Sequence, residues 1–177
     1  IQRSYSNGGK AYYEEIKNRY HDGETQSADS VKNDTTKIFK TKNGKIVYGG
    51  GGITPDYFVA LDTSGITLNT AKLYSRNTIP NFAYKYYLQH QQQFKNYKAP
   101  SDFVKSFSFS EEDWKLFVSV AQKDSVNLSA TIPAEKTDII NRITAAIARQ
   151  VWRNEGLYES INKNDTGVKK ALEVFGK

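Results

Sequence analysis

The spacing of the apolar residues changes once along this 177-residue chain, and the change constrains the fold more than any other feature. Up to Leu61, short segments typical of strands follow a single amphipathic helix. From Asp62 onward, apolar residues recur at intervals of three and four, as on one face of a helix. We therefore expect an α+β chain, with a small α/β part over residues 1–61 and a mostly helical module over residues 62–177.

The first expected element is a short amphipathic helix over Lys10–Tyr20, stopped near Gly23. Its apolar residues share one helical face: Tyr12, Tyr13, Ile16 and Tyr20. Residues 24–35 are rich in Ser, Thr, Asp and Asn, which is typical of a solvated loop.

A hairpin is expected next, with strands Lys37–Thr41 and Lys45–Tyr48 on either side of Asn43-Gly44. Asn-Gly is the strongest short hairpin signal, because both residues accept positive φ. Ile46 and Tyr48 would share one face. Tyr57–Leu61 is apolar throughout, so we expect it to be a strand that returns to a larger sheet and is covered on both faces.

The helical module is expected to contain six helical segments. Ser110 and Asp113 form a capping-box pattern, Pro133 suits the first turn of a helix, and Asp165 can cap the last helix, with Leu172 on its inner face and Gly176 as its stop. Four segments are Leu68–Ser75, Asn81–Tyr97, Ser101–Phe107 and Val168–Phe175. A fifth follows Ser110, with Trp114, Phe117, Val118 and Ala121 on one face. The sixth follows Pro133, and its apolar stripe of Ile139, Ile140, Ile143, Ile147 and Val151 runs to Trp152. The aromatic stripes are interpreted as core and not as ligand platforms.

The composition excludes several classes of protein. The chain has no Cys, which excludes disulfides and thiolate chemistry. The longest apolar run is only five residues, too short for a membrane span, and no signal peptide is recognisable. The net charge is +6 with a pI near 9.3, but the first 50 residues mix nine Lys/Arg with six Asp/Glu. Interspersed positive and negative charges indicate a solvated surface, and we expect no nucleic-acid partner.

No residue set with an evident catalytic or metal-binding pattern is present, and no cofactor is expected. His21 and His90 lack a ligand at metal spacing and are interpreted as surface or helix-end residues. Ser160 and Lys163 have the Ser-x-x-Lys spacing of some nucleophile–base pairs, but 14 Ser and 19 Lys give about 1.5 such spacings by chance. The acidic groups Glu14/Glu15 and Glu111–Asp113 are assigned to helix starts and polar faces.

Four consecutive glycines after Tyr48 are the least expected local feature. A phosphate-binding loop would need Lys-Ser/Thr and a helix directly afterwards, and neither follows. The run is therefore interpreted as a strand exit where backbones approach closely, with Pro55 setting an extended entry to the next strand.

Two segments, in their order, resemble a known family. The start of the chain and the segment after Tyr48 look like the region that follows the catalytic centre of carboxy-terminal processing peptidases (tail-specific serine proteases), in a form similar to Bacteroidetes members. The first segment is Ile1-Gln2-Arg3-Ser4-Tyr5-Ser6-Asn7-Gly8, and the second, a structural motif of the family, is Gly50-Gly51-Gly52-Ile53-Thr54-Pro55-Asp56. The resemblance covers residues 1–61 well and 62–177 more loosely.

The resemblance implies a parent enzyme that is a serine-type peptidase with a Ser nucleophile and a Lys base. In that family those residues belong to motifs that precede a Ser-Ile-Gln segment, to which Ile1-Gln2 are assigned by the resemblance, so Gln2 is not taken as a catalytic residue. No such motif occurs in these 177 residues, and the fragment alone is expected to be inactive. The implied partners are an upstream protease core, a PDZ-like domain and the C-termini of protein or peptide substrates. The implied location is the periplasm or cell envelope of a diderm bacterium. Ile1 in place of Met leads us to expect a chain that begins inside a longer one.

Two other classes remain open from the residues alone. The chain is alternatively a stand-alone basic interaction module that binds an acidic partner or nucleic acid through its positive surface. A third class is a sugar-binding domain that uses exposed Tyr or Trp.

Overall fold

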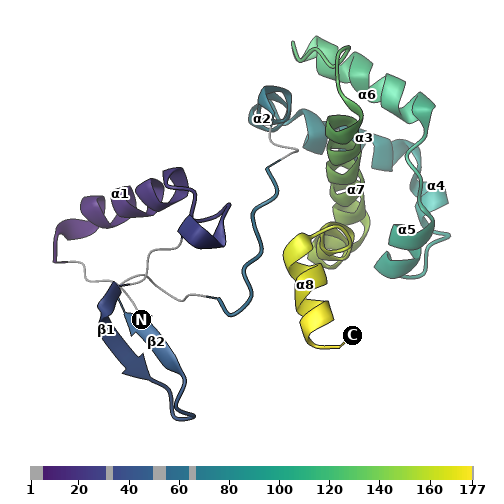
Figure 1. Ribbon diagram of the computed structural model, residues 1–177. Helices are drawn as coiled ribbons and strands as arrows, with labels where there is room; N and C mark the ends of the chain where they lie inside the picture. Colours follow the sequence, from purple (N-terminus) through teal and green to yellow (C-terminus); the bar gives the residue numbers. More distant parts are fainter. Residues whose placement is uncertain (1–5, 31–33, 50–54, 64–66, 177) are drawn as a thin grey trace. The chain divides into compact units, whose positions relative to one another are not determined.

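The computed structural model describes residues 6–30, 34–49, 55–63 and 67–176. It divides the chain into two compact units, Ile1–Asp62 and Thr63–Lys177 (Figure 1). The first unit contains a helix and a two-stranded sheet, and the described part of the second contains helices only. The expected α+β class, a small α/β element followed by a helical module, is confirmed.

The first unit opens with α1, Gly8–His21, which confirms the expected helix. Gly23, at φ +82°, allows the chain to leave the helix, and a short 3-10 turn, η1, spans Ala28–Ser30 in the expected loop. Helix α1 buries none of its residues, although one face carries large apolar side chains. The most exposed of them are Tyr13, Ile16 and Tyr20.

The expected hairpin is confirmed. Strands β1, Asp34–Lys40, and β2, Ile46–Gly49, pair antiparallel, with Ile38 opposite Tyr48 and Phe39 opposite Val47. Gly44 has φ +81°, and its N–H donates to the carbonyl of Thr41 at 2.9 Å. Because side chains alternate between the faces of a strand, Ile38 and Tyr48 lie on one face and Phe39 and Val47 on the other.

The expected strand at Tyr57–Leu61 is wrong. The segment is irregular and largely exposed, with Tyr57 and Leu61 57% and 48% accessible. The Leu61 N–H donates to the carbonyl of Thr25 at 2.8 Å, but no ladder forms. An apolar segment becomes a strand only where a neighbouring strand pairs with its backbone, and the sheet described here stops at two strands.

The second unit is built from seven helices among the residues described. These are α2 (Leu68–Ser75), α3 (Thr78–Gln89), α4 (Gln91–Phe94), α5 (Pro100–Ser106), α6 (Glu111–Lys123), α7 (Pro133–Asn162) and α8 (Thr166–Val174). The expected helix Asn81–Tyr97 is broken at His90, whose φ and ψ of −115° and 19° are not helical. Helices α3 and α5 pack most extensively against α7, so α7 is the central element of the unit (Figure 1).

The helix ends follow their sequence signals. The Asp113 N–H donates to Ser110 Oγ at 3.1 Å while the Ser110 N–H donates to Asp113 Oδ2 at 2.9 Å, which confirms the capping box. Pro133 is in the first turn of α7, and Asp165 Oδ1 accepts the Val168 N–H at 2.8 Å. Gly176, at φ +67°, follows α8 as expected.

The expectation for the face of α8 is wrong. Leu172 is 45% exposed and α8 buries none of its residues. Leu172 follows Val168 by one turn on the apolar side of α8, but this side is only partly covered, since Val168 is half-buried and Leu172 is exposed.

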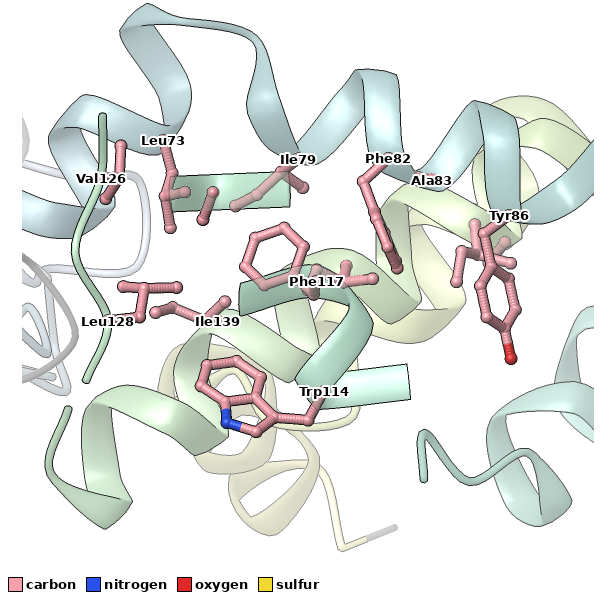
Figure 2. Packing of buried hydrophobic residues seen from close by; sticks show 14 of the residues in the cluster. Leu73, Ile79, Phe82, Ala83, Tyr86, Trp114, Phe117, Val126, Leu128 and Ile139 are labelled. Atoms are coloured by element: carbon pink, nitrogen blue, oxygen red, sulfur yellow. The ribbon is translucent and has the colours of Figure 1, made fainter. Parts of the chain in front are cut away.

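The core of the second unit is aromatic and aliphatic, as expected. Figure 2 shows Phe117 among side chains of α3 and α7, and its ring centroid lies 5.1 Å from that of Phe82 in an edge-to-face contact. Ile139, Ile143 and Ile147 of the α7 stripe are fully buried. No described helix combines the length and the apolar character that a membrane span requires.

Candidate functional site

The glycine-rich motif is only partly described. Gly50, Gly51, Gly52 and Ile53 lie outside the described residues. Pro55 is exposed. The Asp56 carboxylate forms an ion pair with Nζ of Lys45, the residue just before β2. Both partners are more than half exposed, so the pair contributes about 0–1 kcal/mol.

Both histidines lie at helix ends, as the sequence predicts. His21 is the last residue of α1 and its ring meets Tyr20 edge to face at 6.2 Å. His90 Nδ1 lies 2.9 Å from the Tyr86 carbonyl, and its ring stacks on that of Tyr86 at 4.1 Å. No group of three His, Asp or Glu among the described residues has a geometry that could hold a metal ion.

Ser160 and Lys163 do not form a nucleophile–base pair. Lys163 Nζ donates to the carbonyl of Val104 at 2.9 Å. Ser160 Oγ is buried and has no hydrogen-bond partner among the described residues. A Lys base must reach the hydroxyl it deprotonates, and no hydrogen bond joins these two groups.

The acidic residues before Trp114 are structural. Glu111 pairs with Lys136 at 2.6 Å, and the Lys136 ammonium lies 5.2 Å from the centre of the Trp114 ring. Asp113 completes the cap of α6. Burial raises the pKa of Tyr86, and the charge of Asp113 and its hydrogen bond to the hydroxyl raise that pKa further.

A buried carboxylate, Glu135, joins the starts of two helices. Glu135 is 6% exposed and accepts a hydrogen bond from the Thr67 hydroxyl, which also belongs to the capping box of α2. A satisfied carboxylate in the first turn of α7 is also favoured by the helix dipole. Because the carboxylate is buried and already hydrogen-bonded, this arrangement is assigned to stability.

The remaining candidate lies where α7 changes direction. Arg153, inside Pro133–Asn162, has φ 55° and ψ −134°, a conformation that glycine adopts freely and other residues adopt with strain. We call residues 149–156 the elbow of α7. The sequence predicts the apolar stripe up to Trp152, one residue before the reversal, but not the reversal itself.

Gly156 shows how sharp the elbow is. A Cβ at Gly156 would lie 2.5 Å from the carbonyl oxygen of Ala148, eight residues earlier. In a straight helix, eight residues span about 12 Å. The chain after Arg153 therefore folds back onto the end of the preceding segment, and only a glycine fits at the contact.

The elbow encloses an open hollow of about 570 Å³. Two guanidinium groups, two amides, one carboxylate and one indole belong to the residues that line it: Arg149, Arg153, Gln150, Asn154, Glu155 and Trp152. The Trp152 ring packs against Phe103, with ring centroids 5.5 Å apart, so this wall of the hollow is anchored in the core. Sequence reasoning missed these residues, and Gly156 was the one local signal that could have indicated the elbow.

The comparisons with known proteins give one match. Residues 70–153 are similar to a family of unknown function, DUF8443. No curated protein and no solved structure matches the chain. The matched region covers a little under half of the chain, from the first turn of α2 to Arg153 at the elbow.

Proposed function

We propose that this chain is the C-terminal region of a serine-type carboxy-terminal processing peptidase, whose Ser nucleophile and Lys base lie on motifs that precede it. The chain by itself is inactive. Its helical module serves the parent enzyme as a scaffold, a lid or a docking surface. The parent acts in proteolysis, in the periplasm or cell envelope of a diderm bacterium.

The observation that carries the proposal is the hairpin of the first unit. Ile38 and Phe39 point to opposite faces of β1, yet they are 55% and 46% exposed. Strands with apolar residues on both faces are typical of a sheet that is covered on both sides. Two strands alone are marginally stable in water. A core sheet and helices contributed by the preceding part of the peptidase would cover both faces.

The order of the two family-like segments agrees with this interpretation. The first segment, residues 1–8, ends at the first residue of α1, and Gly50–Asp56 follows β2, so the helix and the hairpin lie in the insert between the two segments. The implied partners are therefore the upstream protease core and PDZ-like domain of the same protein. Substrate C-termini would meet the chain only through the parent enzyme.

The second unit suits a role in the parent enzyme other than catalysis. It has its own buried core around α7, and its Ser160 and Lys163 are not hydrogen-bonded to each other. A unit of this kind can position another domain or bind a partner without contributing a nucleophile.

Inactivity of the chain alone is tested with a fluorophosphonate probe and a peptide that ends in apolar residues. We expect neither labelling nor cleavage by the 177-residue chain, and both by a longer polypeptide that includes the preceding region. Labelling of a single Ser in the 177-residue chain together with cleavage of the peptide would reject the proposal.

A second candidate, a basic interaction module, rests on the stretch from Thr63 to Ser101. It contains five Lys/Arg and no Asp or Glu, and its Tyr74 and Tyr84 are 46% and 52% exposed. Binding to a polyanion that weakens steeply with salt would favour this candidate over the peptidase region.

A further inference from the structure

We propose that the elbow of α7 binds a carboxylate that is attached to an apolar group, as in the end of a short peptide or in a small acylated amino acid. The inference does not rest on the peptidase proposal, because it uses only residues 149–156 and their contacts. The hollow, the two cations and the strained backbone support it independently.

The backbone of Arg153 is the first observation. A non-glycine residue in a sparsely populated conformation is strained, and such residues gather at ligand-binding and switch sites. At φ 55° and ψ −134°, glycine would carry almost none of this strain. Arginine at this position offers a guanidinium group that glycine lacks, and Arg153 is one of the residues that line the hollow.

The second observation is that the guanidinium groups of Arg149 and Arg153 are available. Both residues are exposed, and neither makes a hydrogen bond or ion pair with a described residue. Arg142, about two turns before Arg149 on the same helix, has partners by contrast. It donates to Asp138 at 2.6 Å and to the Tyr74 hydroxyl at 3.1 Å. Guanidinium groups bind carboxylates through paired N–H donors.

The other lining residues restrict the ligand further. Glu155 places one negative charge beside the two positive ones, which favours a monoanion over a dianion such as phosphate. The amides of Gln150 and Asn154 can bind peptide groups, since each offers both a donor and an acceptor. The Trp152 ring gives an apolar surface for the group attached to the carboxylate.

The hollow has a suitable size and a rigid frame. About 570 Å³ lies within the range of 300–1,000 Å³ typical of small-molecule sites. The close contact of Gly156 with the Ala148 carbonyl holds the two arms of the elbow together, and the packing of Trp152 on Phe103 fixes one wall of the hollow. The backbone of the elbow is fixed before the ligand arrives, so the conformational entropy lost on binding is mainly that of the two arginine side chains.

The test is a calorimetric titration of the 177-residue chain with four probes at low salt. The probes are N-acetyl-leucine, N-acetyl-Ala-Ala-Leu with a free carboxylate, the same peptide as its C-terminal amide, and inorganic phosphate. We expect at least one free carboxylate to bind at least tenfold more tightly than the amide and than phosphate. If only the peptide acid binds, the ligand is a peptide end, and if both acids bind equally, it is a small acid.

Variants separate the site from general charge effects. Arg149→Gln and Arg153→Gln should each weaken binding of the carboxylate about tenfold or more, whereas Arg153→Lys should keep part of it. Lys115→Gln, which removes an exposed cation of α6, is the matched control and should leave the affinity unchanged. Circular dichroism and thermal unfolding show that each variant is folded.

Four results would overturn the proposal. They are equal binding of acid and amide, tighter binding of phosphate than of either acid, an equal loss of affinity in Lys115→Gln, and a failure of all four probes to bind at low millimolar concentration.

Discussion

Gly156 lies directly against the carbonyl of Ala148, eight residues before it in the same helix, because Arg153 turns the chain back. This contact has no room for a side chain. It holds together the elbow that lines the hollow and ends the segment similar to the family of unknown function.

Gly156→Ala is expected to destabilise the second unit by about 1–3 kcal/mol, because a Cβ 2.5 Å from a backbone oxygen forces the backbone to move. Urea unfolding followed by circular dichroism measures the change. Gly167→Ala is the control: its Cβ would meet only Asp165 Oδ1, at 3.1 Å, and the higher helix preference of Ala in α8 offsets that contact, so the variant should not lose more than about 0.5 kcal/mol. Equal effects of the two substitutions would contradict the close contact.

Arg153→Gly is expected to stabilise the protein by about 0.5–2 kcal/mol. The gain is the relief of a strained conformation, reduced by the greater entropy of glycine in the unfolded chain. Arg149→Gly, in the regular helix four residues earlier, should instead destabilise by about 1 kcal/mol. Chemical denaturation of both variants decides the matter, and a loss of stability in Arg153→Gly would show that the backbone there is not strained.

The stability of the second unit is expected to fall at alkaline pH through Tyr86. Burial, together with Asp113, raises the pKa of this hydroxyl above its usual value of about 10. The folded state therefore favours the protonated phenol. Its contribution is complete below pH 10 and is lost as the pH rises from there toward the raised pKa.

Denaturation midpoints measured between pH 8 and pH 11 should show this fall, and Tyr86→Phe should make it shallower. Tyr84→Phe, on the exposed side of the same helix, is the matched control and should keep the wild-type pH dependence. A Tyr86→Phe profile identical to that of the wild type would contradict the role of the buried hydroxyl.

The two units are expected to differ in local stability. Helix α1 buries no residue and the hairpin exposes apolar side chains on both faces, whereas α7 contributes three fully buried isoleucines. In hydrogen exchange of the 177-residue chain, amides of α1, β1 and β2 should exchange much faster than those of Ile139–Ile147. Comparable protection in both sets would mean that the hairpin needs no further covering.

Local signals explain what the sequence could predict. Asn43-Gly44 located the hairpin, and Ser110, Pro133 and Asp165 located three helix starts, because each acts on backbone groups within a few residues of itself. Tyr57–Leu61 was mispredicted because strand formation depends on a partner that local sequence does not contain.

The candidate site was beyond the reach of such signals. Nothing in the residue type of Arg153 indicates a conformation that glycine prefers, and the break at His90 likewise lacks Gly or Pro. The importance of Arg149 and Arg153 depends on which cations are left without a partner after folding. That property belongs to the packed structure and not to spacing along the chain.

Whether this chain ends a serine peptidase is tested most directly by the coding sequence immediately before the Ile1 codon. We expect an in-frame segment with a Ser in a run of small residues, followed before Ile1 by Gly-Lys-Gly. A start codon directly before Ile1, or an upstream domain that lacks both motifs, would contradict the assignment.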